Sequence, residues 1–163
     1  MLTLETEIFV EGTTGSEILD SLLSCTDEEY RRWWPGTHLE FHTMRQGPGP
    51  HHRGDVVLMD EYIGTRRVRL TGVVESVVPG RVVIYRLRKA IPLPARLRID
   101  CHDRDGGVAL RHTIRAGFGG AGRILDPVLR GFLSPAFAEA MDEHVRTEFP
   151  RLRDRLVEKR AGS

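Results

Sequence analysis

The sequence predicts an α+β domain in which a curved antiparallel sheet of seven strands wraps around a long C-terminal helix. Between Leu4 and Ala116 most segments alternate apolar and polar residues, which is the period of a half-buried strand. Short turn sequences separate several of these segments and agree on one buried face. Apolar residues then recur at helical spacing towards the C-terminus. The chain of 163 residues suits a single domain spanning 1–163.

One strand and two short helices are predicted at the N-terminus. Apolar and polar residues alternate from Leu4 to Val10, as expected of a strand with one buried face. The segment 12–15 breaks this pattern, and Ser16 is a suitable cap for a short helix. Thr26 and Glu29 have the spacing of a capping box and predict a second short helix, which the sequence WWPG should end.

The remaining strands form hairpins whose turns set the register. These strands are predicted over Leu39–Met44, Asp55–Ile63, Arg66–Val78, Arg81–Lys89, Ala95–Asp103 and Val108–Ala116. Gly64-Thr65, Pro79-Gly80 and Asp105-Gly106 are the expected turns. If each has two residues, the three hairpins share one buried face, carrying Met59, Glu61, Val68, Leu70, Val74, Tyr85, Leu87, Leu97, Ile99, Cys101, Leu110, His112 and Ile114.

The second turn makes a further prediction about pairing. It places Val74 opposite Tyr85 and Ser76 opposite Val83. Tyr85 and Ser76 would then both point inward and offer hydroxyl groups to the interior.

The opposite face of the sheet is predicted to be exposed. It places Asp60 opposite Arg69 and Tyr62 opposite Arg67, which are favourable cross-strand pairs. We therefore interpret Arg66, Arg67 and Arg69 as an exposed face paired with Asp60 rather than as a basic binding patch.

A long C-terminal helix is predicted to cover the buried face. Its sheet-facing stripe is expected to contain Phe137, Met141, Val145 and Leu152. Pro135 suits the first helical turn, whereas Pro150 should kink the helix or divide it. An antiparallel sheet with one apolar face needs a cover, and a curved sheet around one helix commonly leaves space between them.

Composition excludes several functional classes. The net charge of +1 gives no field that would favour nucleic acid or an anionic membrane. No apolar stretch approaches the roughly 20 residues of a membrane span, and Glu5 and Glu7 interrupt any signal-like N-terminus. Cys25 and Cys101 lie in different predicted elements, so we expect no disulfide and a cytoplasmic protein.

Several segments resemble a known superfamily. They are YRRWWPG at Tyr30–Gly36, Gly54 before a strand, Asp105-Gly106-Gly107, and the spacing of Phe137, Met141 and His144. With the order of elements from Leu4 to Leu156, they are similar to the START-like (SRPBCC) superfamily, which has the helix-grip fold.

The resemblance carries expectations about function. The group includes pollen-allergen-like ligand carriers, polyketide cyclases and aromatases, lipid-transfer domains and activators of chaperone ATPases. It implies a deep cavity between sheet and long helix that takes hydrophobic or amphipathic small molecules, without a bound metal or organic cofactor. It supplies no shared catalytic residues that could be assigned here, and Pro150 departs from the pattern of a straight last helix.

The register and the helical stripe together define candidate ligand-binding residues. They are Met59, Glu61, Leu70, Val74, Tyr85, Leu97, Ile99, Leu110, His112, Phe137 and Met141. Such a set, mostly apolar with few polar groups, is typical of small-molecule sites.

His112, Glu61 and Tyr85 are also the candidate catalytic residues. An inward-facing histidine can contact a ligand or carry a proton near neutrality; alternatively, His112 is a core histidine with a satisfied hydrogen bond. Glu61 is either a polar point in the cavity or a solvated residue at its rim. The Tyr85 hydroxyl either faces a ligand or bonds to the backbone.

Five other polar residues invite a zinc interpretation. His38, Glu40 and His42 share one strand face, and His51 and His52 follow in a loop. The residues between the first three should take the buried face, leaving those three side chains in solvent. We therefore predict no metal site. His144, on the sheet-facing side of the last helix, is a further residue that can reach the cavity.

The glycines at 117, 119 and 122 imitate a dinucleotide-binding fingerprint. The preceding strand belongs to an antiparallel meander, and no parallel strand completes a βαβ unit. We interpret this segment as a flexible connection.

Two functions of different class follow, with a third less favoured. The first is a carrier or sensor of a small hydrophobic molecule, and the second is a cyclase- or aromatase-type enzyme in which cavity residues move protons. The third is a protein-interaction module of the chaperone-ATPase-activator type. The sequence is compatible with a homodimer, and it does not determine the ligand or whether the ligand is turned over.

Overall fold

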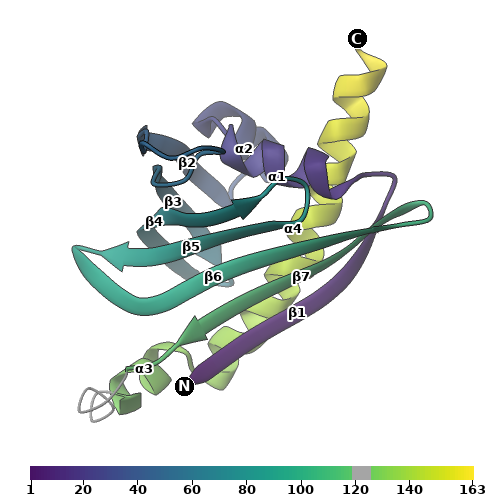
Figure 1. Cartoon of the computed structure of the whole chain (residues 1–163). Coiled ribbons are helices and arrows are strands. Elements are labelled where there is room, and N and C mark those ends of the chain that lie inside the picture. The colour runs from purple at the N-terminus through teal and green to yellow at the C-terminus, as the bar shows by residue number, and fades with distance from the viewer. Residues whose placement is uncertain (119–125) are drawn as a thin grey trace.

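The computed structural model describes residues 1–118 and 126–163, and it has the predicted α+β architecture (Figure 1). The strands are β1 (Leu2–Glu11), β2 (His38–Arg45), β3 (Val56–Ile63), β4 (Arg66–Val78), β5 (Val82–Lys89), β6 (Ile91–Arg104) and β7 (Gly107–Ala116). The helices are α1 (Gly15–Leu23), α2 (Asp27–Trp33), α3 (Asp126–Phe132) and α4 (Pro135–Ala161).

One curved sheet surrounds the C-terminal helix. Its strands are antiparallel and follow the order β1-β7-β6-β5-β4-β3-β2. The helix α4 crosses the inner face of this sheet and contacts β1, β3, α1 and α2 (Figure 1). The prediction of a seven-stranded sheet gripping one long helix is confirmed.

Helix caps agree with the sequence at two of three predicted starts. Thr26 caps α2 by accepting a hydrogen bond from the Glu29 amide, and Pro135 occupies the first turn of α4. The prediction of Ser16 as the α1 cap is wrong. Thr14 has extended backbone and forms a reciprocal capping box with Glu17, so Ser16 already lies inside the helix.

Pro150 does not divide α4, which is one continuous helix from Pro135 to Ala161. A proline removes one backbone donor from the helical ladder. Here the neighbouring side chains Phe149 and Leu152 are buried in the core, and this packing offsets the loss. The long helix that crosses the inner face of the sheet is therefore unbroken.

The predicted register is confirmed in the first and third hairpins and partly in the second. Met59 pairs with Leu70, and Ile99 with His112. Across β4 and β5, Val74 pairs with Tyr85 as predicted, but Ser76 pairs with Ile84 rather than Val83. A β-bulge between Val74 and Ser76 inserts one extra residue into β4, which shifts the pairing beyond it.

On the outer face of the sheet, Asp60 is fully buried rather than exposed. Arg67 donates to both of its carboxylate oxygens, at 2.9 and 2.7 Å, and Arg69 donates at 2.9 Å. The two half-exposed guanidinium groups cover the carboxylate. The predicted pairing of Asp60 with these arginines is confirmed, and its exposure is corrected.

The structure also bears on the predictions for the cysteines, the glycine-rich segment and membrane spans. Cys25 and Cys101 are both free and buried. Gly119 and Gly122, which belong to the segment interpreted as a flexible connection, lie outside the described residues. None of the helices in the described part of the chain has the length and apolarity that a membrane span requires.

Candidate functional site

A cavity of about 400 Å³ lies between the inner face of the sheet and α4. Its apolar wall comprises Met59, Ile63, Val68, Leu70, Leu87, Leu93, Ala95, Leu97, Ile114, Ala116, Leu129, Leu133, Phe137 and Met141. Glu61, His112, His144 and Glu148 form its polar wall, and Arg66, Arg67, Arg69 and Lys89 also border it.

Hollows on the outer face of the sheet differ in character. Two of them have volumes of about 460 and 780 Å³, and about half of the residues that line each are charged, with Asp100 and Arg111 bordering both. Their volume does not compensate for this polarity, because an apolar molecule needs an apolar wall. The inner cavity is therefore the candidate site.

The structure divides the predicted ligand-binding residues into two groups. Those that line the cavity are Met59, Glu61, Leu70, Leu97, His112, Phe137 and Met141. The others, Val74, Tyr85, Ile99 and Leu110, are buried in the core away from the lining. Within the described residues, the Tyr85 hydroxyl has no hydrogen-bond partner, and burial raises its pKa.

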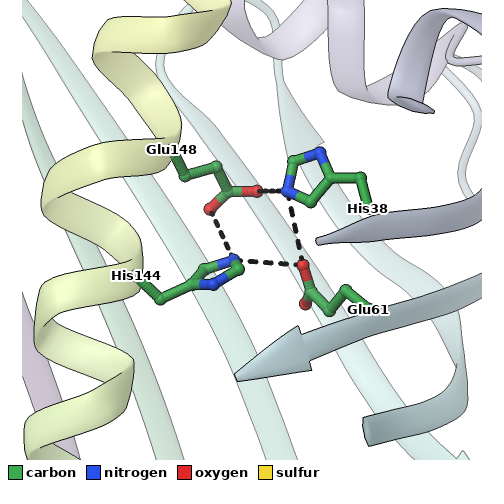
Figure 2. Close-up of side chains that lie close together, drawn as sticks. All are labelled: His38, Glu61, His144 and Glu148. Carbon is green, nitrogen blue, oxygen red and sulfur yellow. Dashed lines mark hydrogen bonds and ion pairs between the residues drawn. The ribbon is translucent and has the colours of Figure 1, made fainter. Parts of the chain in front are cut away.

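Four polar side chains converge beside the cavity, and we call them the quartet: His38, Glu61, His144 and Glu148 (Figure 2). They come from β2, β3 and α4. Glu61 Oε2 lies 3.1 Å from His144 Nε2 and 3.7 Å from His38 Nε2. Glu148 Oε1 lies 3.5 Å from His38 Nε2, and Glu148 Oε2 lies 3.8 Å from His144 Nε2. Four contacts therefore close a ring, as the dashed lines of Figure 2 show.

A β-bulge in β2 brings His38 into this group. His38 pairs with Glu61 and Glu40 with Asp60, so Leu39 is the extra residue between them. The bulge reverses the alternation before it and turns His38 inward, where its side chain is fully buried. The prediction that His38 faces solvent is wrong for this reason.

Aromatic residues from the end of α2 surround the two imidazoles. The Tyr30 ring stacks on His38 with centroids 3.7 Å apart, and Trp34 stacks on His144 at 4.8 Å. Trp33 donates from its indole nitrogen to the Glu148 carbonyl at 2.7 Å, which ties α2 to α4. Both tryptophans thus support the quartet and lie outside the cavity lining.

The hydrogen bond to the backbone fixes the tautomer of His38. Its Nδ1 lies 3.2 Å from the Tyr30 carbonyl oxygen, which can only accept, so Nδ1 carries the proton. Desolvation lowers the pKa of His38 to about 4, although the nearby Glu61 opposes this shift. The ring is therefore neutral at pH 7, and its Nε2 presents a lone pair to the two carboxylates.

Glu61 and His144 form the charged pair of the quartet. Burial opposes ionisation of Glu61, but the hydrogen bond with His144, the charge of that imidazolium and the hydroxyl of Tyr30 hold its pKa below the ordinary value. Tyr30 donates to Glu61 at 2.6 Å. Burial also opposes protonation of His144, yet Glu61 and Glu148 raise its pKa to about 9.

The pKa of Glu148 shifts in the opposite direction to that of Glu61. Desolvation, together with the charge of Glu61, raises its pKa, and only His144 opposes this shift. Its contacts with the two imidazole nitrogens, at 3.5 and 3.8 Å, are longer than normal hydrogen bonds. Glu148 is thus a buried carboxylate with weak protein partners.

His112 lies on the polar wall of the cavity, as its inward register predicts. Desolvation lowers its pKa to about 4, and the charge of Glu61 only partly offsets this. The imidazole is neutral at pH 7 and can donate one hydrogen bond and accept another through its two nitrogens.

The other histidines of the 38–52 segment lie apart from the quartet. His42 Nδ1 contacts Asp27 at 2.7 Å, and His52 Nδ1 contacts Asp55 at 3.0 Å. His51 is exposed. Within the described residues, the histidines of this segment thus form no cluster with one another, and His38 belongs to the quartet.

Sequence reasoning missed Glu148 and misplaced His38. The helical stripe of Met141, Val145 and Leu152 has Glu148 at the same periodic spacing, and His144 lies four residues before it on the same face. An acidic residue within an apolar stripe was therefore an available signal. The inward turn of His38 depends on a bulge that the sequence pattern does not reveal.

Comparisons with known proteins agree with this architecture. The chain matches no known family model and no curated protein sequence. It is similar in structure to the protein TTHA0849 from Thermus thermophilus, with a TM-score of 0.63, 11% identity, and coverage of 97% of this chain and 99% of that one.

Two other solved structures are similar. The di-domain ARO/CYC StfQ from the steffimycin biosynthetic pathway gives a TM-score of 0.58 at 19% identity; the match covers 99% of this chain and 53% of StfQ. The Aha1 dimer from Colwellia psychrerythraea gives 0.51 at 12% identity, with coverage of 92% and 98%. The chain therefore shares the helix-grip fold of these structures, which is the fold that the resemblance in the sequence predicts.

Proposed function

We propose that the chain binds a small hydrophobic or amphipathic molecule in the cavity between sheet and α4, as a carrier or sensor. The observation that carries this proposal is the cavity itself, about 400 Å³, with fourteen apolar lining residues among those described and one polar wall. Small-molecule sites typically have about 300–1,000 Å³ and a few convergent polar groups on an apolar lining.

The polar wall suggests how the ligand is oriented. An apolar body would contact Leu70, Leu97 and Phe137, while a hydroxyl or carbonyl group would face His112 and Glu61. An uncharged polar group suits the part of this wall beside Glu61, whereas Arg66, Arg67, Arg69 and Lys89 border the cavity elsewhere. A polyketide- or lipid-like molecule with an alcohol or ketone has this chemistry.

A cytoplasmic location accompanies the proposal. The two cysteines are buried free thiols whose pKa burial raises to about 12. Thiols in this state are stable in a reducing compartment.

The test is native mass spectrometry of protein purified from its own host, with the wild type compared to Leu97→Trp. The larger side chain fills the cavity, so the retained small molecule should be lost. Arg98→Trp is the matched control, because the adjacent residue points outward from the same strand and is half-exposed. Retention of the same molecule by Leu97→Trp would reject the cavity as its binding place.

A cyclase-type enzyme is the second candidate, favoured by the opposite protonation states on the polar wall. Glu61 is held as a carboxylate and His144 as an imidazolium, which is the pairing that general base and acid catalysis requires. The fold shared with StfQ is compatible with this activity. If His112→Gln weakens binding but leaves turnover of a reactive chain unchanged, the proton-carrier role of His112 is excluded.

A further inference from the structure

The quartet is a polar cluster in which Glu61 and His144 form a hydrogen bond at 3.1 Å, whereas one buried ring nitrogen has no such partner among the described residues. His38 Nδ1 donates to the Tyr30 carbonyl, so Nε2 of the neutral ring is an acceptor. Glu148 Oε1 and Glu61 Oε2 face it at 3.5 and 3.7 Å, distances longer than a normal hydrogen bond. His38 Nε2 accordingly has no hydrogen-bond partner among the described residues, although the side chain is fully buried. Buried polar atoms of this kind require an explanation.

A cation between the four side chains supplies the missing partner. We propose that the quartet binds one divalent transition-metal ion, with Zn²⁺ as the ion its ligands fit best, through Nε2 of His38 and His144 and the carboxylates of Glu61 and Glu148. An ion of charge +2 would accept the lone pair of His38 Nε2, displace the proton of His144 Nε2 and any proton on the Glu148 carboxyl group, and balance the charge of the two carboxylates.

The distances fit such a site. Bonds of about 2.0–2.1 Å place neighbouring ligands of a tetrahedral ion about 3.4 Å apart. The four contacts around the ring measure 3.1, 3.5, 3.7 and 3.8 Å. All four ligand atoms lie within 4.8 Å of one another, so small side-chain rotations complete the polyhedron.

Outer contacts already orient the ligands. The Tyr30 carbonyl fixes the orientation of His38, and the Tyr30 hydroxyl donates to Glu61. His144 forms a hydrogen bond with the backbone of Tyr62. Metal-binding histidines and carboxylates in proteins have such second partners, which fix the tautomer and the ring orientation. Two imidazoles and two carboxylates favour a first-row transition ion over Ca²⁺ or Mg²⁺, which prefer oxygen alone.

This inference stands independently of the cavity ligand, because all four metal ligands belong to the protein. The ion would link β2 and β3 to α4, so it should also stabilise the fold.

The test is calorimetric titration of chelator-treated protein with Zn²⁺ at pH 7. The wild type should bind one ion per chain and unfold at a higher temperature when loaded. Glu148→Gln keeps the shape of the side chain and should weaken binding by about 100-fold or more, since it removes one ligand charge. His38→Gln should do the same; if it does not fold, Glu148→Gln carries the test.

Two controls separate the quartet from other histidines. His112→Gln changes a buried cavity histidine outside the quartet and should leave Zn²⁺ affinity unchanged. The double variant His51→Gln/His52→Gln removes the loop histidines and should also bind normally. Absence of stoichiometric Zn²⁺ binding in the wild type overturns the proposal, as does loss of binding in the loop variant with retention in Glu148→Gln.

Discussion

Asp60 and Glu61 are neighbours on β3 that point to opposite faces of the sheet, and their surroundings differ sharply. Asp60 accepts three hydrogen bonds from Arg67 and Arg69 and is fully buried beneath them. The hydrogen bonds of Arg67 in particular hold its pKa below the ordinary value. Glu61 shares a buried cluster with Glu148, whose contacts with the two imidazoles are longer than normal hydrogen bonds.

The buried charge of Asp60 has a full set of partners, as expected of a stabilising cluster, whereas the quartet has the incomplete set expected of the binding site that we propose. In the outer cluster of Asp60, Arg67 and Arg69, the carboxylate accepts three hydrogen bonds, because guanidinium groups match carboxylate geometry. In the quartet, Nε2 of His38 has no hydrogen-bond donor among the described residues, although the carboxyl groups of Glu61 and Glu148 lie beside it. Incomplete satisfaction of buried polar groups is costly, and proteins retain it mainly at functional sites.

The largest effect is expected from Asp60→Asn. The amide cannot accept all three charged hydrogen bonds, and we expect the free energy of unfolding to fall by about 3 kcal/mol. Urea denaturation at pH 7 measures this change. Glu75→Gln is the control, because it alters an exposed pair with Arg96 that should contribute less than about 1 kcal/mol. If the two substitutions lowered the free energy of unfolding equally, the buried outer cluster would contribute no more to stability than an exposed ion pair.

A smaller effect is expected for the pH dependence contributed by His112. Its folded-state pKa of about 4 lies below the ordinary value of 6.5, so its contribution to stability is present above pH 6.5 and lost as the pH falls towards 4. In metal-free protein, His112→Gln should reduce the loss of stability between about pH 7 and pH 4.5 by about 2 kcal/mol. Urea denaturation at both pH values checks this, and an unchanged difference would show that His112 is solvated.

The smallest effect is expected from Glu148→Gln in metal-free protein, although the chemical change is the same as in Asp60→Asn. Desolvation favours the protonated form of Glu148, which the amide resembles in shape and charge. We expect unfolding free energy at pH 7 to change by less than about 1 kcal/mol. A loss as large as that of Asp60→Asn would mean that the quartet is a structural network.

The sequence predicts most of the fold because local signals agree with one another. Turn sequences such as Asp105-Gly106 set the pairing of their hairpins, and Thr26 and Pro135 mark helix starts correctly. The bulge in β2 at Leu39 and the bulge in β4 between Val74 and Ser76 have no comparable signal.

The candidate site was predictable in part. Glu61 and His112 were correctly expected to face inward, because both lie in strands whose hairpin register is fixed by a turn. The sequence does not show which inward residues line a cavity, because α4 shares the covering of the sheet with α1 and α2. Helix α1 packs against β6 near Cys101, and Ile99 beside it lies in the solid core.

The four methionines allow the most direct test of the cavity as a binding place. Met59 and Met141 line it and are buried, whereas Met1 and Met44 are 85% and 58% exposed. In a methyl NMR titration of methionine-labelled protein with naphthol, a neutral aromatic alcohol, we predict saturable shifts of the Met59 and Met141 signals alone. Unmoved signals of this pair, or shifts confined to Met1 and Met44, would contradict binding between the sheet and α4.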